Sequence, residues 1–156
     1  MDTVASAHAG ENDGLDQLAV ALVQQAALLS RLVSLRLDVA VSRTEASLLA
    51  RLEAGPQRIT ALADLDGLAQ PTVTLLVKNL ERQGAVRRQR SADDGRVVLV
   101  SLTNAGHEAL ELVRTRYRER MRACLSQLAG GEIAALESAL PAMASLVERL
   151  QPEGSR

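Results

Sequence analysis

The sequence predicts a mainly α-helical protein with one small β-hairpin, and three observations support this. Apolar residues recur at helical spacing over most of the chain, the period changes to that of a strand after residue 84, and an Asp-Gly pair separates two strand-like segments. The composition fits a core of aliphatic side chains, since hydrophobic residues make up 47% and aromatic residues 1% of the 156. A chain of this length is expected to form one domain.

The N-terminal part is predicted to be a flexible tail followed by a long helix. Residues 1–13 are small or polar and lack periodicity. From Leu15 onward, apolar residues form two neighbouring helical stripes, which predict burial on two sides by a bundle or by a partner subunit. The longest apolar run in this part, residues 18–23, is far shorter than the roughly 20 residues of a membrane span. We therefore expect no membrane-crossing segment, and the absence of leader features predicts a cytoplasmic protein.

Three short helices are predicted within about forty residues of the centre. Ser42 and Glu45 have the spacing of a capping box, which marks the start of the first helix. Thr60 is in a position to cap the second. Pro71 suits the first turn of the third helix, and Gly84 is its expected C-terminal stop.

The segments on either side of "SADDG" are predicted to be the two strands of a hairpin. By alternation, Val86, Val98 and Val100 are expected to rest on the rest of the domain. A long helix is then expected from Thr103 to the Gly-Gly pair at 130–131. The last helix has a heptad-like apolar seam and contains Pro141, which predicts a kink or break, and residues 151–156 form a tail.

Three helices followed by a hairpin is the order of a winged helix-turn-helix, here residues 41–102. In such a fold the third helix enters the major groove of DNA and the hairpin, or wing, lies along the phosphates. The predicted outward face of the third helix carries short hydroxyl, amide and amino groups that suit base edges and phosphates, although an ordinary amphipathic helix has the same pattern. These residues are Gln70, Thr72, Thr74, Lys78 and Asn79.

The wing adds positive charge to this segment. The whole chain has a formal net charge of -1, yet residues 78–96 hold six basic groups against three acids. Arg96 is placed to enter a narrow minor groove, and Asp94 to orient its guanidinium, although an exposed salt bridge at a turn is the alternative. The wing arginines predicted to contact DNA are Arg87, Arg88, Arg90 and Arg96.

At these residues the sequence resembles the MarR family of bacterial transcription regulators, from about Leu15 to Leu150. The most specific part is "DDGRVVLVSLTNAG", similar to the family's wing signature. The segment "QPTVTLLVKNLERQGAVRR" is similar to the family's recognition helix and its turn into the wing. The signature residues in this chain are Asp94, Arg96, Leu102, Thr103 and Gly106.

The resemblance implies an obligate homodimer held by the helices of residues 14–40 and 103–150, with two recognition helices on a pseudo-palindromic operator. It also implies that a small phenolic or carboxylate effector binds beside the DNA-binding region, and the lack of aromatics predicts an aliphatic pocket. The candidate anion-binding arginines are Arg36, Arg43 and Arg114. The chain departs from the family at Leu75, where a polar residue is common, so base contact at that position is in doubt.

An enzyme is not expected. The histidines His8 and His107 and the single cysteine, Cys124, form no plausible zinc site or Cys-His pair, and no cofactor or metal is implied. Cys124 is interpreted as a buried small apolar residue, not a redox sensor. The favoured function is a dimeric, ligand-responsive repressor associated with the nucleoid. The alternative is a helical dimerisation module whose winged domain binds protein.

Overall fold

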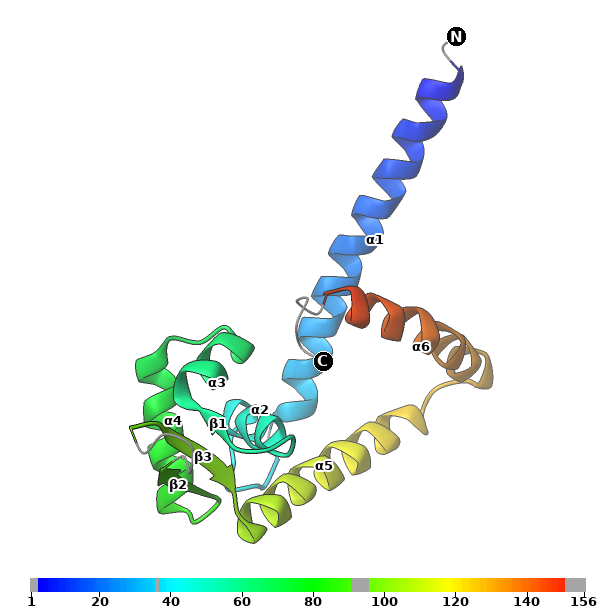
Figure 1. Cartoon of the computed structure of the whole chain (residues 1–156). Helices are drawn as coiled ribbons and strands as arrows, with labels where there is room; N and C mark the ends of the chain where they lie inside the picture. The colour runs from blue at the N-terminus through cyan, green and yellow to red at the C-terminus, as the bar shows by residue number, and fades with distance from the viewer. Residues whose placement is uncertain (1–2, 36, 91–95, 151–156) are drawn as a thin grey trace. The chain divides into compact units, whose positions relative to one another are not determined.

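The computed structural model describes the backbone of residues 3–35, 37–90 and 96–150, with side chains from residue 13 onward. The chain divides into two compact units, Met1–Tyr117 and Arg118–Arg156. The elements in chain order (Figure 1) are α1 (Thr3–Ser34), α2 (Arg43–Leu52), β1 (Gln57–Arg58), α3 (Ile59–Asp66), α4 (Gln70–Arg82), β2 (Val86–Arg90), β3 (Val98–Leu102), α5 (Asn104–Leu125) and α6 (Gly130–Leu150). The predicted class, mainly helical with a small β wing, is confirmed.

The three central helices begin and end largely as predicted, with one exception. Ser42 is the N-cap of α2, and it forms the complete capping box with Glu45. Gly67 ends α3 with a left-handed φ of 61°, a conformation that glycine adopts without strain. The prediction for Thr60 was wrong, because α3 starts one residue before it and its N-cap is Arg58, without a side-chain cap. Pairing of β1 holds the chain extended up to Arg58, so the helix begins directly after the strand.

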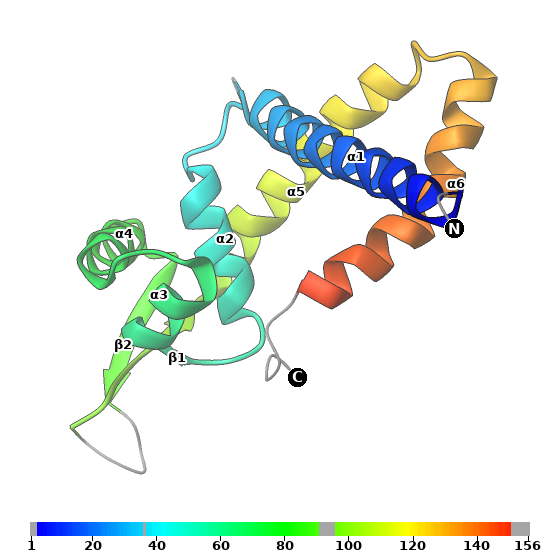
Figure 2. The same cartoon turned by 90° about the horizontal axis from the view of Figure 1, so that it is seen from above.

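The wing belongs to a three-stranded antiparallel sheet of order β1-β3-β2, not to the isolated two-stranded hairpin that the sequence predicts. Two residues are too few to show a strand period, which is why β1 was missed. Val86 and Val100 are buried as expected. Val98 is 45% exposed, contrary to prediction, because it pairs with Arg90 at the end of the hairpin that lies beyond the helices (Figure 2).

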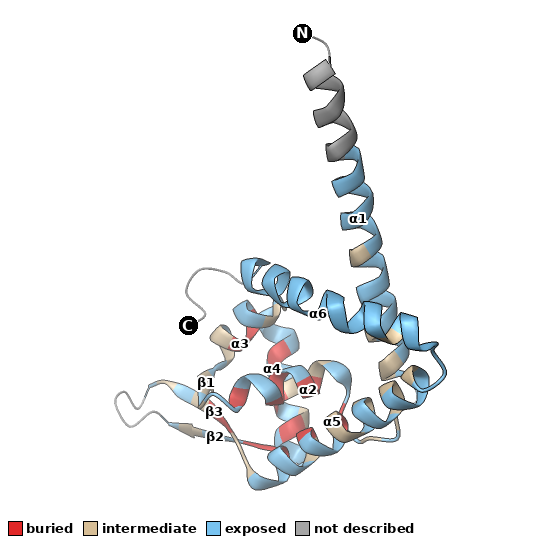
Figure 3. Ribbon diagram, turned by 90° about the vertical axis from the view of Figure 1, so that its right-hand side faces the viewer, coloured by how far each residue is buried: buried red, intermediate tan, exposed pale blue. Residues whose placement is uncertain are grey.

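The hydrophobic core lies among α2, α3, α4, the sheet and the first turns of α5 (Figure 3). The buried apolar residues described in this core are all aliphatic, and Tyr117 packs against them, partly buried. The fully buried side chains are Leu48, Leu49, Leu62, Val73, Val77, Leu80, Val100 and Val113.

The first helix begins earlier than predicted, at Thr3 and not near Leu15. Alanines at positions 5, 7 and 9 favour helix, so the lack of apolar periodicity does not stop it. By length and mean hydropathy (1.2), the Asp13–Ser34 part of α1 could cross a membrane, and none of it is buried. The sequence prediction used a stricter criterion, the length of an uninterrupted apolar run, and this segment does not meet it although its average hydropathy is high enough.

The last two helices differ from prediction at their junction. α5 ends at Leu125, and Gly130 is the first residue of α6, not a stop for α5. The Glu132 carboxylate accepts a hydrogen bond from the Ala129 backbone N–H at 2.8 Å, which stabilises this new helix start. α6 runs as one helix through Pro141, so the chain does not break there, and the kink that the sequence predicts as the alternative stays a prediction.

Neither α1 nor α6 is covered. No residue of α6 is buried, and Cys124, which was expected to be buried, is exposed near the end of α5. Both α1 and α6 appear pale blue over most of their length in Figure 3. Large exposed apolar side chains are Leu15, Leu18, Val20, Val23, Leu28, Leu29, Leu32 on α1 and Leu136, Leu140, Met143, Leu146, Val147, Leu150 on α6.

Candidate nucleic-acid interface

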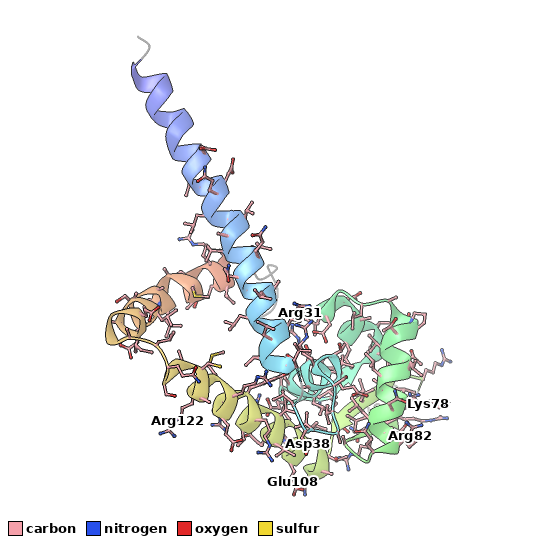
Figure 4. All side chains as sticks on the ribbon, turned by 180° about the vertical axis from the view of Figure 1, so that it is seen from behind. Arg31, Asp38, Lys78, Arg82, Glu108 and Arg122 are labelled. Atoms are coloured by element: carbon pink, nitrogen blue, oxygen red, sulfur yellow. The ribbon has the colours of Figure 1, made fainter. Side chains whose placement is uncertain are left out.

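α4 has one face in the core and one in solvent. Val73, Val77 and Leu80 are at most 1% exposed, and they hold the helix against α2, α3 and the sheet. Figure 4 shows Lys78 and Arg82 projecting from the opposite face, away from the elements on which α4 packs. The exposed side chains of this helix include Gln70, Thr72, Thr74, Leu75, Lys78 and Arg82.

Two of the predicted contact residues are already engaged within α4. The Thr74 hydroxyl donates to the Gln70 carbonyl oxygen at 2.9 Å, which leaves its methyl group and oxygen lone pairs for a ligand. Asn79 is only half-exposed, and its Oδ1 accepts from Arg82 Nη2 at 3.5 Å. Sequence reasoning omitted Arg82 from the site. Its spacing from Lys78, one helical turn, was the signal that could have included it.

The wing arginines lie on both faces of β2. Arg88 and Arg90 share a face with Val86, whereas Arg87 is on the other face, where its Nε donates to Ser101 Oγ at 3.1 Å. Arg88 Nε lies 3.3 Å from Glu81 Oε2 and so joins the wing to α4. The side of β2 that carries Arg88 therefore lies beside the C-terminal part of α4.

The turn of the wing is only partly described. Arg96 is exposed, just before β3. Asp94 lies outside the described residues, so its predicted contact with Arg96 stays a prediction.

The end of the wing is fixed by a polar junction at the start of α5. The Thr103 hydroxyl lies within hydrogen-bond distance of two backbone carbonyl oxygens that can accept its proton. The Gly84 oxygen is 2.6 Å away and the Ala85 oxygen is 3.0 Å away. Thr103 Oγ1 also accepts from the Gly106 N–H at 3.1 Å, which makes Thr103 the N-cap of α5. A Cβ on Gly106 would overlap the Ala85 carbonyl oxygen. These contacts hold the helix start against the turn between α4 and β2.

The three arginines predicted to bind an effector lie in different surroundings. Arg36 is outside the described residues. Arg43 on α2 donates from Nη1 to Ser30 Oγ of α1 at 2.8 Å. Arg114 is enclosed by two carboxylates, with Glu53 bound through both oxygens at 2.6 and 2.9 Å and Glu111 at 2.7 Å. An anion at Arg114 would compete with these two carboxylates for the guanidinium.

Electrostatics agree with a structural role for Arg114. The hydrogen bond that Arg114 donates lowers the pKa of the Glu53 carboxyl. The bonds that Glu53 and Glu111 accept raise the pKa of the Arg114 guanidinium above its ordinary value. Among the side chains that the structure describes, no group of three His, Cys, Asp or Glu residues is arranged to hold a metal. A hollow on one side of α1 contains none of the predicted effector residues, since it is lined by Asp16, Gln17, Val20, Ala21 and Gln24.

Comparison with known proteins identifies the family. The MarR family model matches residues 41–98, the segment from just before α2 to the start of β3. Among curated proteins, none matches this sequence.

Solved structures share the fold over most of the chain. A probable transcriptional regulator from Pseudomonas aeruginosa is 30% identical, with a TM-score of 0.59 over 82% of this chain and 97% of that one. Transcriptional regulator Tm0710 from Thermotoga maritima is 26% identical, with a TM-score of 0.63 over 88% and 96%. A MepR variant from Staphylococcus aureus, solved bound to an oligodeoxyribonucleotide, is 22% identical, with a TM-score of 0.60 over 83% and 97%.

The three short helices with their β wing, the exposed face of α4 and these similarities agree on one assignment, a transcription regulator and not an enzyme. The chain belongs to the MarR family of transcription regulators.

Proposed function

We propose that this protein is a homodimeric repressor of the bacterial cytoplasm that binds a pseudo-palindromic operator. The observation that carries the proposal is the contact between Arg88 on β2 and Glu81 on α4, 3.3 Å apart, which brings the basic wing beside the exposed helix face. Duplex DNA fits this surface, because a helix can enter the major groove while arginines neutralise the adjacent phosphates. A dimer bound over a promoter excludes polymerase, which is why we propose repression.

The roles follow from position on this surface. The helix residues meet base edges and nearby phosphates, and the wing residues follow the backbone, with Arg96 in the minor groove and Asp94 orienting it. The proposed helix contacts are Gln70, Thr72, Thr74, Lys78 and Asn79. The proposed wing contacts are Arg87, Arg88, Arg90 and Arg96.

Exposed apolar surface supports the dimer. α1 and α6 together leave more than ten large aliphatic side chains in solvent, which a second copy would cover. Polar residues favour a protein partner over a membrane for α1: Asp13, Gln17, Gln24 and Arg31 are spaced so that they share one helical face. Two α4 helices related by a twofold axis would read half-sites about 34 Å apart.

An effector response is part of the proposal. Arg43 is the predicted anion-binding residue that the local contacts favour most, because its described partner is the neutral Ser30 hydroxyl and not a carboxylate. Nearby, Ser34 Oγ lies 3.4 Å from the hydroxyl of Tyr117, the one aromatic residue in the sequence. A small phenol or carboxylate bound among these groups would act on the segment between α1 and α2.

The DNA-binding proposal is tested with paired arginine variants. Duplexes selected from a random pool by the purified protein supply the probe, and fluorescence anisotropy measures its affinity at two salt concentrations. Arg96→Ala is expected to weaken binding by about 1–3 kcal/mol and to leave the dimer intact. Arg122→Ala removes the same charge from an exposed position on α5, outside the proposed surface, and should have little effect. Equal affinity of both variants and the wild type would contradict the proposal and favour a protein-binding wing.

A further inference from the structure

Leu75 is an apolar residue that the core does not use. It is 60% exposed, whereas Val73 and Val77, two residues away on either side, are buried. Leu76 supplies the partly buried edge of the same core face. The helix would pack equally well with a small or polar residue at position 75, so packing does not account for a leucine there.

Leu75 lies in the middle of the exposed face of α4. Residues three, four and seven apart share one side of a helix, so Leu75 lies in line with Pro71, Lys78 and Arg82. Lys78 and Arg82 project from that side in Figure 4. If Lys78 and Arg82 bind phosphates of a DNA duplex, the base edges in the major groove beside those phosphates come close to Leu75.

The chemistry of the major groove leaves few partners for a leucine. Base edges there present hydrogen-bond donors and acceptors, with the C5-methyl group of thymine as the apolar exception. A leucine placed over donors or acceptors strips their water and returns no hydrogen bond, which is unfavourable. Over a thymine methyl, the same side chain buries apolar surface on both partners.

We infer that Leu75 reads a thymine methyl group in each operator half-site and is a specificity-determining residue. The inference rests on the proposed function, because it requires α4 to lie in the major groove. It extends that function by naming a base that the operator must contain opposite the centre of the helix.

The test removes the methyl group alone. In the selected duplex, each thymine is replaced singly, together with its symmetry mate, by deoxyuridine, which keeps base pairing and differs only at C5. Burial of one methyl group predicts a weakening of roughly fourfold per half-site at one thymine pair for the wild type. Leu75→Ala should bind the thymine duplex more weakly and lose the difference between thymine and uracil at that pair.

Two matched variants sharpen the result. Leu65→Ala shortens another exposed leucine, 39% accessible on α3 and outside the helices proposed to hold the dimer, and should keep the full response to uracil. Leu75→Met keeps an apolar side chain of similar size and should keep most of the difference in affinity between the thymine and uracil duplexes. The inference is overturned if replacing thymine by deoxyuridine changes the affinity of the wild type at no position, or if the change is the same in Leu75→Ala. Either result would leave the selected operator, and so the proposed function, intact. Failure to select any preferred duplex would overturn the proposed function as well.

Discussion

Thr103 and Gly106 explain in physical terms why the wing ends as it does. One hydroxyl bonds to the turn after α4 and also caps α5, and a residue without a side chain lets the helix start approach the Ala85 backbone. Both residues belong to the segment that carries the family resemblance. The structural role of these two residues is to fix the direction in which the chain leaves β3 and enters α5.

Replacing Gly106 by alanine is expected to destabilise the protein by about 2 kcal/mol, because the added methyl overlaps a carbonyl oxygen that belongs to a fixed turn. Urea denaturation measures the change. Gly131→Ala is the control, since a Cβ there meets nothing within 4 Å and lies inside α6, so stability should hold or rise. An equal loss in both variants would show that backbone freedom, not the close contact, matters.

At the same scale, sequence reasoning could predict exposure but not pairing. Helical period alone indicated that Lys78 and Thr72 face outward, and they do. It could not reveal that Arg114 binds Glu53, because the two are 61 residues apart and their contact depends on how α5 packs. Arg114 was therefore interpreted as an anion-binding candidate.

Between elements, the ion pair of Arg114 with Glu53 joins α5 to the end of α2. Two hydrogen bonds run between one guanidinium and one carboxylate, the geometry that arginine favours. Glu53 is the C-cap residue of α2, so the pair fixes the point where that helix ends. Both side chains are partly exposed, which limits the stabilisation through solvent screening.

The lowered pKa of Glu53 gives this pair a pH dependence. A carboxyl whose pKa is lower in the folded state stabilises the fold at every pH above its ordinary pKa of 4.5. This contribution is lost as the pH falls through the pKa of the folded state. Glu53→Gln should thus reduce Tm slightly at pH 7, with the difference from wild type shrinking toward pH 3. Glu108→Gln removes a negative charge from an exposed position on α5 and serves as the control. A difference that stays constant with pH would contradict the ion-pair explanation.

Whole elements were predictable where a local signal marks them. The capping box of α2 and the Pro71 start of α4 act through neighbouring residues, so the sequence indicates both. β1 exists because β3 offers it a partner, and that partner lies about 40 residues away. Gly130 could end one helix or begin the next, and Glu132 decides in favour of the second by capping.

For the whole molecule, the buried core belongs to the first unit, Met1–Tyr117. α6, in the second unit, has an apolar seam and no buried residue. A seam at heptad-like spacing is the pattern by which helices pair, so the sequence already indicated the kind of contact that would complete this unit. It could not indicate whether the partner is the same chain or another copy.

A charge placed in the seam separates these possibilities. Leu140 is 61% exposed, so Leu140→Glu should be harmless to a monomer. In a dimer that buries the seam, each unpaired carboxylate costs about 3 kcal/mol or more, enough to raise the dissociation constant over 100-fold. Light scattering should give about twice 16.6 kDa for the wild type and the single-chain mass for the variant. Ser145→Glu adds the same charge on the other side of α6 and should stay dimeric, because a carboxylate there remains in water. A wild-type protein of single-chain mass would refute the dimer, and with it the paired half-sites, since one copy carries a single α4.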